Sequence, residues 1–392
     1  MSRLLFSTGS ARGGTNLVTK AISVREDALV ICDPMLAIFK SLRSAAIRKR
    51  LNIDIDPEAS LADYYYLDDL RMQKWATYEA SLDLEFHSGE TKTLQNSLRR
   101  RMSLTCQNGI RFVDQWKGET YLELFDKAFN CLKAAFGKSD VSLFGVNENW
   151  AIEFFPALAK AYPESMFMVI VRDPRAAACS ALLQKDKNRI APILSFCRGW
   201  RKNIAYIEQF KKDATFNDRL LVVRYEDLVY QPKKYFNLIL EKFDLAFSNA
   251  MADSKNYKDG KGGNWRANSH IHTKNKDGIF TDSVSAWRTR MERDAIATVE
   301  FICAPEMRLH GYAPVFCEDG VLSQETSAYL EKNEQQRASW RSSSATLEYE
   351  LKNEMNRYRL LGTRMNVSDL DQQRGFLFAS TFEALTLANR SP

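Results

Sequence analysis

Residues 3–16 read RLLFSTGSARGGTN, a mostly apolar run that ends in a glycine-rich loop. The run from Arg3 to Thr8 predicts a short buried strand, and apolar residues recur at helical spacing beyond the loop. The loop therefore joins a strand to a helix. A turn of this kind presents backbone N–H groups and the positive end of the helix dipole to an anion.

The residues of this loop suit a phosphate-like ligand. Gly13 and Gly14 let the main chain approach closely, Arg12 adds a fixed positive charge, and Thr15 and Asn16 add side-chain donors. A glycine-rich turn alone is weak evidence, because an ordinary strand-to-helix turn can carry the same glycines. An ATP-hydrolysing phosphate loop is disfavoured, since its GxxxxGK[ST] pattern needs a lysine where this chain has Thr15.

A second motif, VRDPRAAACS, occupies residues 171–180 at the end of another apolar run. Asp173 predicts the N-cap of a helix and Pro174 its first position. Arg172 then lies at the carboxyl end of a strand, where open α/β sheets bind ligands, and Ser180 falls on the helix that follows. Arginine with serine suits a second phosphate, because a guanidinium forms paired charge-assisted hydrogen bonds.

The rest of the chain alternates between strand and helix patterns. The other predicted strands are Ala28–Cys32, Val141–Val146, Met166–Val171 and Leu220–Arg224, and the predicted helices include Trp150–Tyr162, Pro174–Leu183, Ile190–Phe210, Lys233–Phe243 and Trp287–His310. This alternation predicts an α/β fold with a mostly parallel central sheet flanked by helices. Residues 252–283 predict a long loop.

Two helical segments accompany the predicted sheet. Asp33 and Pro34 predict the N-cap and first residue of a helix leading into a helical insertion, or cap, at residues 40–138. We expect one α/β domain over residues 1–318, cap included, and a helical C-terminal extension over residues 319–392. In the extension, an apolar stripe at helical spacing predicts a helix docked on the domain rather than a coiled coil. The stripe consists of Leu347, Leu351, Met355 and Tyr358.

Composition narrows the function classes. The 392 residues include 55 Lys and Arg against 49 Asp and Glu, a formal net charge of +6. So small an excess does not indicate a nucleic-acid-binding surface, but it suits an anionic small ligand. The 7 cysteines form no CxxC pair, which argues against a disulfide framework or structural zinc. Because no stretch of about 18 apolar residues occurs, we expect a cytoplasmic protein that meets its substrate in the cytosol or at a membrane surface.

Together the two motifs resemble those of the PAPS-dependent sulfotransferases, in which PAPS is 3′-phosphoadenosine 5′-phosphosulfate. SARGGTN resembles the 5′-phosphosulfate loop of that family, and VRDPRAAACS is similar to its 3′-phosphate motif. LLVVRYEDLVYQP, NWRANSH, SVSAWR and HGYAP resemble later segments, the last three being similar to glycan and protein-tyrosine sulfotransferases. The resemblance covers residues 3–38 and 141–314 and implies a fold like that of P-loop NTPases.

The resemblance implies a donor site. Arg12 and the amides of Gly13, Gly14 and Thr15 would hold the phosphosulfate, with Arg12 also acting in catalysis, and Arg172 and Ser180 would hold the 3′-phosphate. The other nucleotide-binding residues that it implies are Asn16, Tyr225, Trp265, Asn268, Ser269 and Arg288. No metal is implied. Many relatives carry a lysine near the first loop that contacts the bridging oxygen, and this loop offers Arg12 alone.

The acceptor hydroxyl needs a general base. The glycan and tyrosylprotein branches often use a carboxylate just past the second strand, a position that Asp33 holds, 21 residues after Arg12. Glu148, after the third predicted strand, is a second candidate for the base, and Glu90 in the cap is a third. Two loop histidines, His270 and His272, could contact the acceptor or the nucleotide.

The leading hypothesis is transfer of a sulfuryl group from PAPS to a carbohydrate or glycolipid hydroxyl, which releases the nucleotide product PAP. A P-loop-type nucleotide kinase and a non-catalytic nucleotide-binding protein are the alternatives. The cap is expected on the acceptor side, where its aromatic residues and Arg99–Arg101 suit a sugar or an anionic acceptor as well as helix packing. Contact with a membrane surface and self-association stay open.

Overall fold

The fold is described from a computed structural model of the chain. It describes residues 2–59, 68–183, 192–259, 262–265, 279, 281–317, 320–335, 346–363 and 367–390. Several predicted site residues fall outside these ranges, namely Asn268, Ser269, His270 and His272. In the described part of the chain, no helix is both long enough and apolar enough to cross a membrane.

Five parallel strands form one sheet within the described ranges, in the order β2-β3-β1-β4-β5. They are β1 (Arg3–Gly9), β2 (Ala28–Cys32), β3 (Leu143–Asn147), β4 (Met166–Val171) and β5 (Leu220–Arg224). The predicted α/β fold with a parallel sheet is confirmed, with strand ends shifted by two residues at most. Because the strands are parallel, all their carboxyl ends meet at one edge of the sheet.

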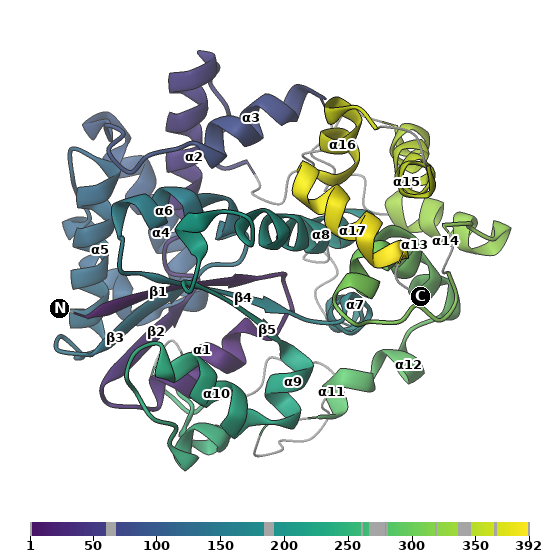
Figure 1. Cartoon of the computed structure of the whole chain (residues 1–392). Coiled ribbons are helices and arrows are strands. Elements are labelled where there is room, and N and C mark those ends of the chain that lie inside the picture. The colour runs from purple at the N-terminus through teal and green to yellow at the C-terminus, as the bar shows by residue number, and fades with distance from the viewer. Residues whose placement is uncertain are drawn as a thin grey trace.

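Helices cover both faces of the sheet (Figure 1). One face packs on α1 (Thr15–Ser23), α9 (Tyr225–Tyr230) and α10 (Pro232–Glu241). The other carries a larger apolar core with α2 (Leu36–Leu51), α4 (Thr91–Thr105), α5 (Tyr121–Ala135), α6 (Phe155–Ala161), α8 (Ile193–Phe210) and α13 (Arg293–Leu309). The remaining helices are α3 (Asp68–Tyr78), α7 (Pro174–Leu182), α11 (Asp282–Ser285), α12 (Trp287–Arg290), α14 (Gln324–Gln335), α15 (Leu347–Gly362), α16 (Asp369–Phe376) and α17 (Ala379–Arg390).

The start of the cap differs from the prediction. Asp33 is not a helix N-cap, because its backbone adopts a left-handed conformation with φ 49° and α2 begins only at Leu36, after Met35. The backbone N–H of Met35 donates instead to the carboxylate of Glu148, which follows β3. A side chain 113 residues away therefore satisfies the start of α2, and the carboxylate of Asp33 is left for another role.

The C-terminal helices gather around α13 and one end of α8 (Figure 1). The predicted docked helix is confirmed at three of the four stripe positions, since Leu347, Leu351 and Tyr358 pack on the main core. Met355 is the exception and is 53% exposed. On the same helix, Glu350, Glu354 and Arg357 are buried. The helix therefore docks through buried charged side chains as well as through apolar ones.

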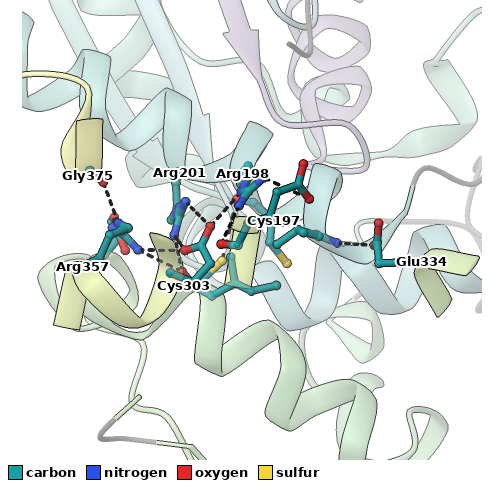
Figure 2. A network of polar contacts seen from close by, with 12 residues as sticks. Cys197, Arg198, Arg201, Cys303, Glu334, Arg357 and Gly375 are labelled. Atoms are coloured by element: carbon teal, nitrogen blue, oxygen red, sulfur yellow. Dashed lines mark hydrogen bonds and ion pairs between the residues drawn. The ribbon is translucent and has the colours of Figure 1, made fainter. Parts of the chain in front are cut away.

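Figure 2 shows this buried polar network. Glu354 accepts hydrogen bonds from Arg198 Nε at 2.7 Å and from Arg201 Nη1, while Arg357 pairs with Glu306 of α13 and donates to the carbonyl of Gly375. Although burial alone would raise the pKa of Glu354, the positive charges of the three arginines lower it to about 2.

Candidate active site

Polar residues follow each of the five strands at their shared carboxyl edge. In sheet order they are Asp33 after β2, Glu148 after β3, Arg12 after β1, Arg172 after β4 and Tyr225 after β5. The sheet therefore brings together the residues of both sequence motifs and two of the three candidate bases, although they are scattered over more than 190 positions of the chain.

The glycine-rich loop is held open toward this edge. Gly14 has φ 89°, and a Cβ there would overlap the ring of Tyr225. Gly14 is also the N-cap of α1 and supplies no side-chain cap, so the first-turn N–H groups of α1 face the site without a side-chain acceptor. The hydroxyl of Ser10 is buried in this loop and has no hydrogen-bond partner among the described residues.

Arg12, Ser180 and Arg172 lie in contact. Arg12 Nε donates to Ser180 Oγ at 3.1 Å, and Arg172 Nη1 donates to the carbonyl of Arg12 at 2.8 Å. Burial lowers the pKa of Arg12, and the positive charge of Arg172 lowers it further. Two partly desolvated cations placed this close favour binding of an anion beside them.

Arg172 is fixed by several other groups. Its Nη2 donates to the carbonyl of Ser283 at 2.7 Å, its guanidinium lies 4.4 Å from the ring centre of Tyr225, and its own carbonyl accepts from Trp200 Nε1 at 2.9 Å. Its buried Nε has no partner among the residues described. These contacts fix the orientation of the Arg172 guanidinium at the edge of the sheet.

The helix after Arg172 is built as predicted. Asp173 accepts from the N–H of Arg175 at 2.9 Å and caps α7, with Pro174 in its first turn. The structure adds a partner that sequence reasoning missed, since the N–H of Asp173 donates to Glu226 Oε1 at 3.0 Å. Glu226 follows Tyr225 directly, so β4 and β5 are locked together at the site.

Asp33 sits on the opposite side of the loop. Its carboxylate accepts from the N–H of Asn149 at 3.3 Å and lies 3.4 Å from Arg101 of the cap. Thr15 Oγ1 donates to the side chain of Asn149 at 3.4 Å, which links the carboxylate to the glycine-rich loop. Burial raises the pKa of Asp33 although Arg101 opposes the shift. Sequence reasoning missed Asn149, whose position directly after Glu148 was its one signal.

Only one carboxylate oxygen of Glu148 accepts a hydrogen bond from the described residues. Oε1 accepts from the N–H of Met35, whereas Oε2 is buried without a partner among the described residues. Burial and the nearby charge of Asp33 raise the pKa of Glu148 well above 4.5. These contacts give Glu148 a structural role at the start of α2.

The structure does not bring every predicted residue to the edge. Glu90 pairs with Arg48 at 3.1 Å and lies about 16 Å along α4 from Arg101. The ring of Trp265 packs on Tyr257 with centroids 5.6 Å apart. Arg288 is exposed over Trp287. Asn16 lies in the first turn of α1 beside the glycine-rich loop, and its main-chain carbonyl accepts from Thr19 Oγ1. Among the described residues, no group of three His, Cys, Asp or Glu could hold a metal ion.

A parallel sheet with a glycine-rich loop and paired arginines at its carboxyl edge defines an α/β protein of the phosphate-loop class. The sequence model of the Sulfotransferase family matches residues 5–249. Since that match covers more than half of the chain, the protein belongs to the sulfotransferase family.

Individual relatives match over shorter stretches or at lower identity. Carbohydrate sulfotransferase 7 of Mus musculus is 30% identical over 116 residues, and its counterpart in Rattus norvegicus is 28% identical over 116 residues. Each match covers 30% of this chain and 23% of the relative, so the matched segment spans about a quarter of those proteins.

Two solved structures are similar at low identity. The sulfotransferase domain of the Synechococcus PCC 7002 olefin synthase is 13% identical with a TM-score of 0.42, covering 75% of this chain and 89% of that one. The sulfotransferase domain from the curacin biosynthetic pathway is also 13% identical, with a TM-score of 0.40, covering 87% and 99%. The family assignment rests on the sequence match.

Proposed function

We propose that this protein transfers the sulfuryl group of PAPS to a hydroxyl of a carbohydrate or glycolipid acceptor. The observation that carries the proposal is the contact between Arg12, Ser180 and Arg172 beside the open glycine-rich loop, with a buried carboxylate, Asp33, two strands away. The name of the curated relatives, carbohydrate sulfotransferase 7, supports a carbohydrate acceptor.

In the proposed reaction the nucleotide lies across the edge of the sheet. Arg172 and Ser180 bind its 3′-phosphate, and Arg12 with the amides of the loop binds the phosphosulfate. Such positive groups act chiefly by positioning the reactants and by stabilising charge on the transferred and leaving oxygens.

Asp33 acts as the general base. The acceptor oxygen attacks sulfur while the bond between sulfur and the phosphate oxygen breaks, the hydroxyl proton passes to Asp33, and PAP leaves. Asn149 orients the carboxylate through its N–H, 3.3 Å from Asp33 Oδ1. Arg101, 3.4 Å from the carboxylate, opposes the rise in the pKa of Asp33 that burial causes.

Calorimetric titration with PAP, with AMP (which lacks the 3′-phosphate) and with ATP–Mg²⁺ tests the donor assignment. We expect PAP to bind in the micromolar range, AMP to bind far more weakly, and Arg172→Ala to abolish PAP binding without unfolding the protein, as thermal melting would verify. Tight binding of ATP–Mg²⁺ with no preference for the 3′-phosphate would contradict the proposal and favour the kinase alternative.

A further inference from the structure

A basic strip runs along the cap away from the candidate base. It consists of Lys40 and Arg43 on α2 and Ser97, Arg100 and Arg101 on α4. Residues three or four apart share one face of a helix, and α2 and α4 pack against each other. The strip begins at Arg101, which lies 3.4 Å from Asp33, so it leads from the reacting position outward over the cap.

A carboxylate of the chain itself occupies this strip. Glu58 Oε2 lies 2.8 Å from Arg100 Nη2 and 3.8 Å from Lys40 Nζ, and Ser97 donates to its other oxygen. The main chain beside it is held as well, since Lys40 Nζ donates to the carbonyl of Glu58 at 2.6 Å and Arg43 Nη2 donates to that of Ala59 at 2.9 Å. A turn closed by Asp56, which accepts from the N–H of Glu58, presents the carboxylate.

Another anion can replace Glu58 in its ion pair with Arg100, because this ion pair is exposed to solvent. The side chains of Glu58 and Arg100 are 41% and 71% exposed, and exposed ion pairs are weak because water and salt screen them. A second carboxylate or a sulfate group of similar geometry can therefore replace Glu58 at little cost. The cationic groups would remain paired in either state.

We propose that the basic strip is a subsite for an acidic glycan acceptor and that Glu58 fills it until the acceptor binds. This inference rests on the proposed function, because the proposed base Asp33 decides where the acceptor binds relative to the strip. It adds that the acceptor carries a carboxylate or sulfate near the sugar that is modified, and that this group contacts Lys40, Ser97 and Arg100.

The test is calorimetric binding of a hyaluronan hexasaccharide, which carries carboxylates, and of its carboxyl-reduced neutral form to the full chain. Glu58→Gln removes the internal competitor, and we expect it to tighten binding of the acidic probe about two- to fivefold. Lys40→Met with Arg100→Gln should weaken the same binding by at least as much. The neutral probe should respond to neither change.

Two matched controls separate the strip from general charge effects. Asp54→Asn removes a carboxylate of the same segment that pairs with Arg48 instead, and Arg99→Gln removes a cation beside Arg100 that pairs with Asp114. Both should leave the affinity for the acidic probe within about twofold of wild type, the range that exposed ion pairs explain. Thermal melting confirms that every variant is folded.

The inference is overturned if Glu58→Gln and Asp54→Asn have equal effects, if the acidic and neutral probes bind alike, or if neither form binds to Glu58→Gln. A Glu-rich peptide of equal charge that binds more tightly than the glycan would also overturn it. The PAP titration is independent of this result. If PAP binds normally but binding of the acidic probe does not respond to the variants, only the proposed subsite is wrong. If the acidic probe responds as expected but PAP does not bind, only the donor assignment is wrong.

Discussion

Arg12 Nε donates a hydrogen bond to Ser180 Oγ at 3.1 Å across 168 residues of sequence. The contact joins the glycine-rich loop to the helix of the second motif, so the groups proposed for the two phosphate positions form one continuous surface. A nucleotide that spans both positions is therefore the most informative probe of the site.

Ser180→Ala should weaken the preference for a 3′-phosphate, with Arg172 still in place. A hydrogen bond from an uncharged hydroxyl to a charged group contributes about 1.5–3 kcal/mol, so we expect the affinity for PAP to fall tenfold or more. Binding of AMP, measured on the same variant by calorimetry, should change little. An equal loss for both nucleotides would show that Ser180 does not contact the 3′-phosphate.

Gly14→Ala should abolish nucleotide binding, because the new methyl group would overlap the ring of Tyr225. Gly137→Ala is the matched control, since Gly137 also has positive φ, at 63°, but faces open space. Each alanine should lose about 1 kcal/mol of stability through backbone strain. PAP binding should disappear in Gly14→Ala alone, and retained binding there would contradict the loop geometry.

Asp33→Asn should lower kcat by a factor of about 10² to 10⁴, the usual contribution of a general base, while the affinity for PAP stays unchanged. Glu148→Gln should keep most of the turnover, because the amide oxygen of glutamine can still accept from Met35. If Glu148→Gln lost turnover and Asp33→Asn kept it, the roles of the two carboxyl groups would be reversed.

The same assignment predicts a pH effect. Burial raises the pKa of Asp33 above its ordinary 3.8, and the base works only when ionised. In wild-type protein kcat/KM should therefore fall, as pH is lowered, at a higher pH than an exposed aspartate would cause. Arg101→Gln, which removes the opposing positive charge, should move this acidic limb to still higher pH. If the acidic limb did not move, Arg101 would not influence the ionisation of the base.

Glu354→Gln should destabilise the protein by about 3–5 kcal/mol, because it removes the carboxylate that pairs with the buried Arg198 and Arg201. Denaturant unfolding measures this, with the exposed Glu348→Gln on the same helix as the control. The pKa of Glu354 is lowered from 4.5 to about 2, so this carboxyl group ionises at a lower pH in the folded state than in the unfolded state. Its stabilising effect is complete above about pH 4.5 and should disappear as pH falls toward 2, a dependence that Glu354→Gln should lack.

Sequence patterns predicted the sheet and the two motifs well, because both depend on local signals. Short apolar runs mark β1 to β5, and Asp173 with Pro174 marks the start of α7 within a few residues. The contact of Arg12 with Ser180 depends on the order of the strands in the sheet, which the sequence patterns did not predict.

The errors arose where a distant residue overrides a local preference. Asp33 and Pro34 read as a helix start, but Glu148 supplies the acceptor for Met35 and frees Asp33 to adopt a left-handed conformation. On the C-terminal helix α15, local patterns predicted the apolar contacts of Leu347, Leu351 and Tyr358 but not the burial of Glu354. Glu354 looks like a solvent-exposed residue in any one-dimensional pattern, and only the arginines of α8, more than 150 positions away, explain its burial.

The order of the strands fixes the distances between the residues along the carboxyl edge of the sheet. Adjacent strands lie about 4.8 Å apart, and three strand steps separate Asp33 on β2 from Arg172 on β4, a span of about 14 Å. Main-chain hydrogen bonding fixes this span, so substitutions in the cap cannot stretch it. Related proteins could therefore exchange acceptors by rebuilding the cap while the separation between the proposed base and the proposed 3′-phosphate position stays constant.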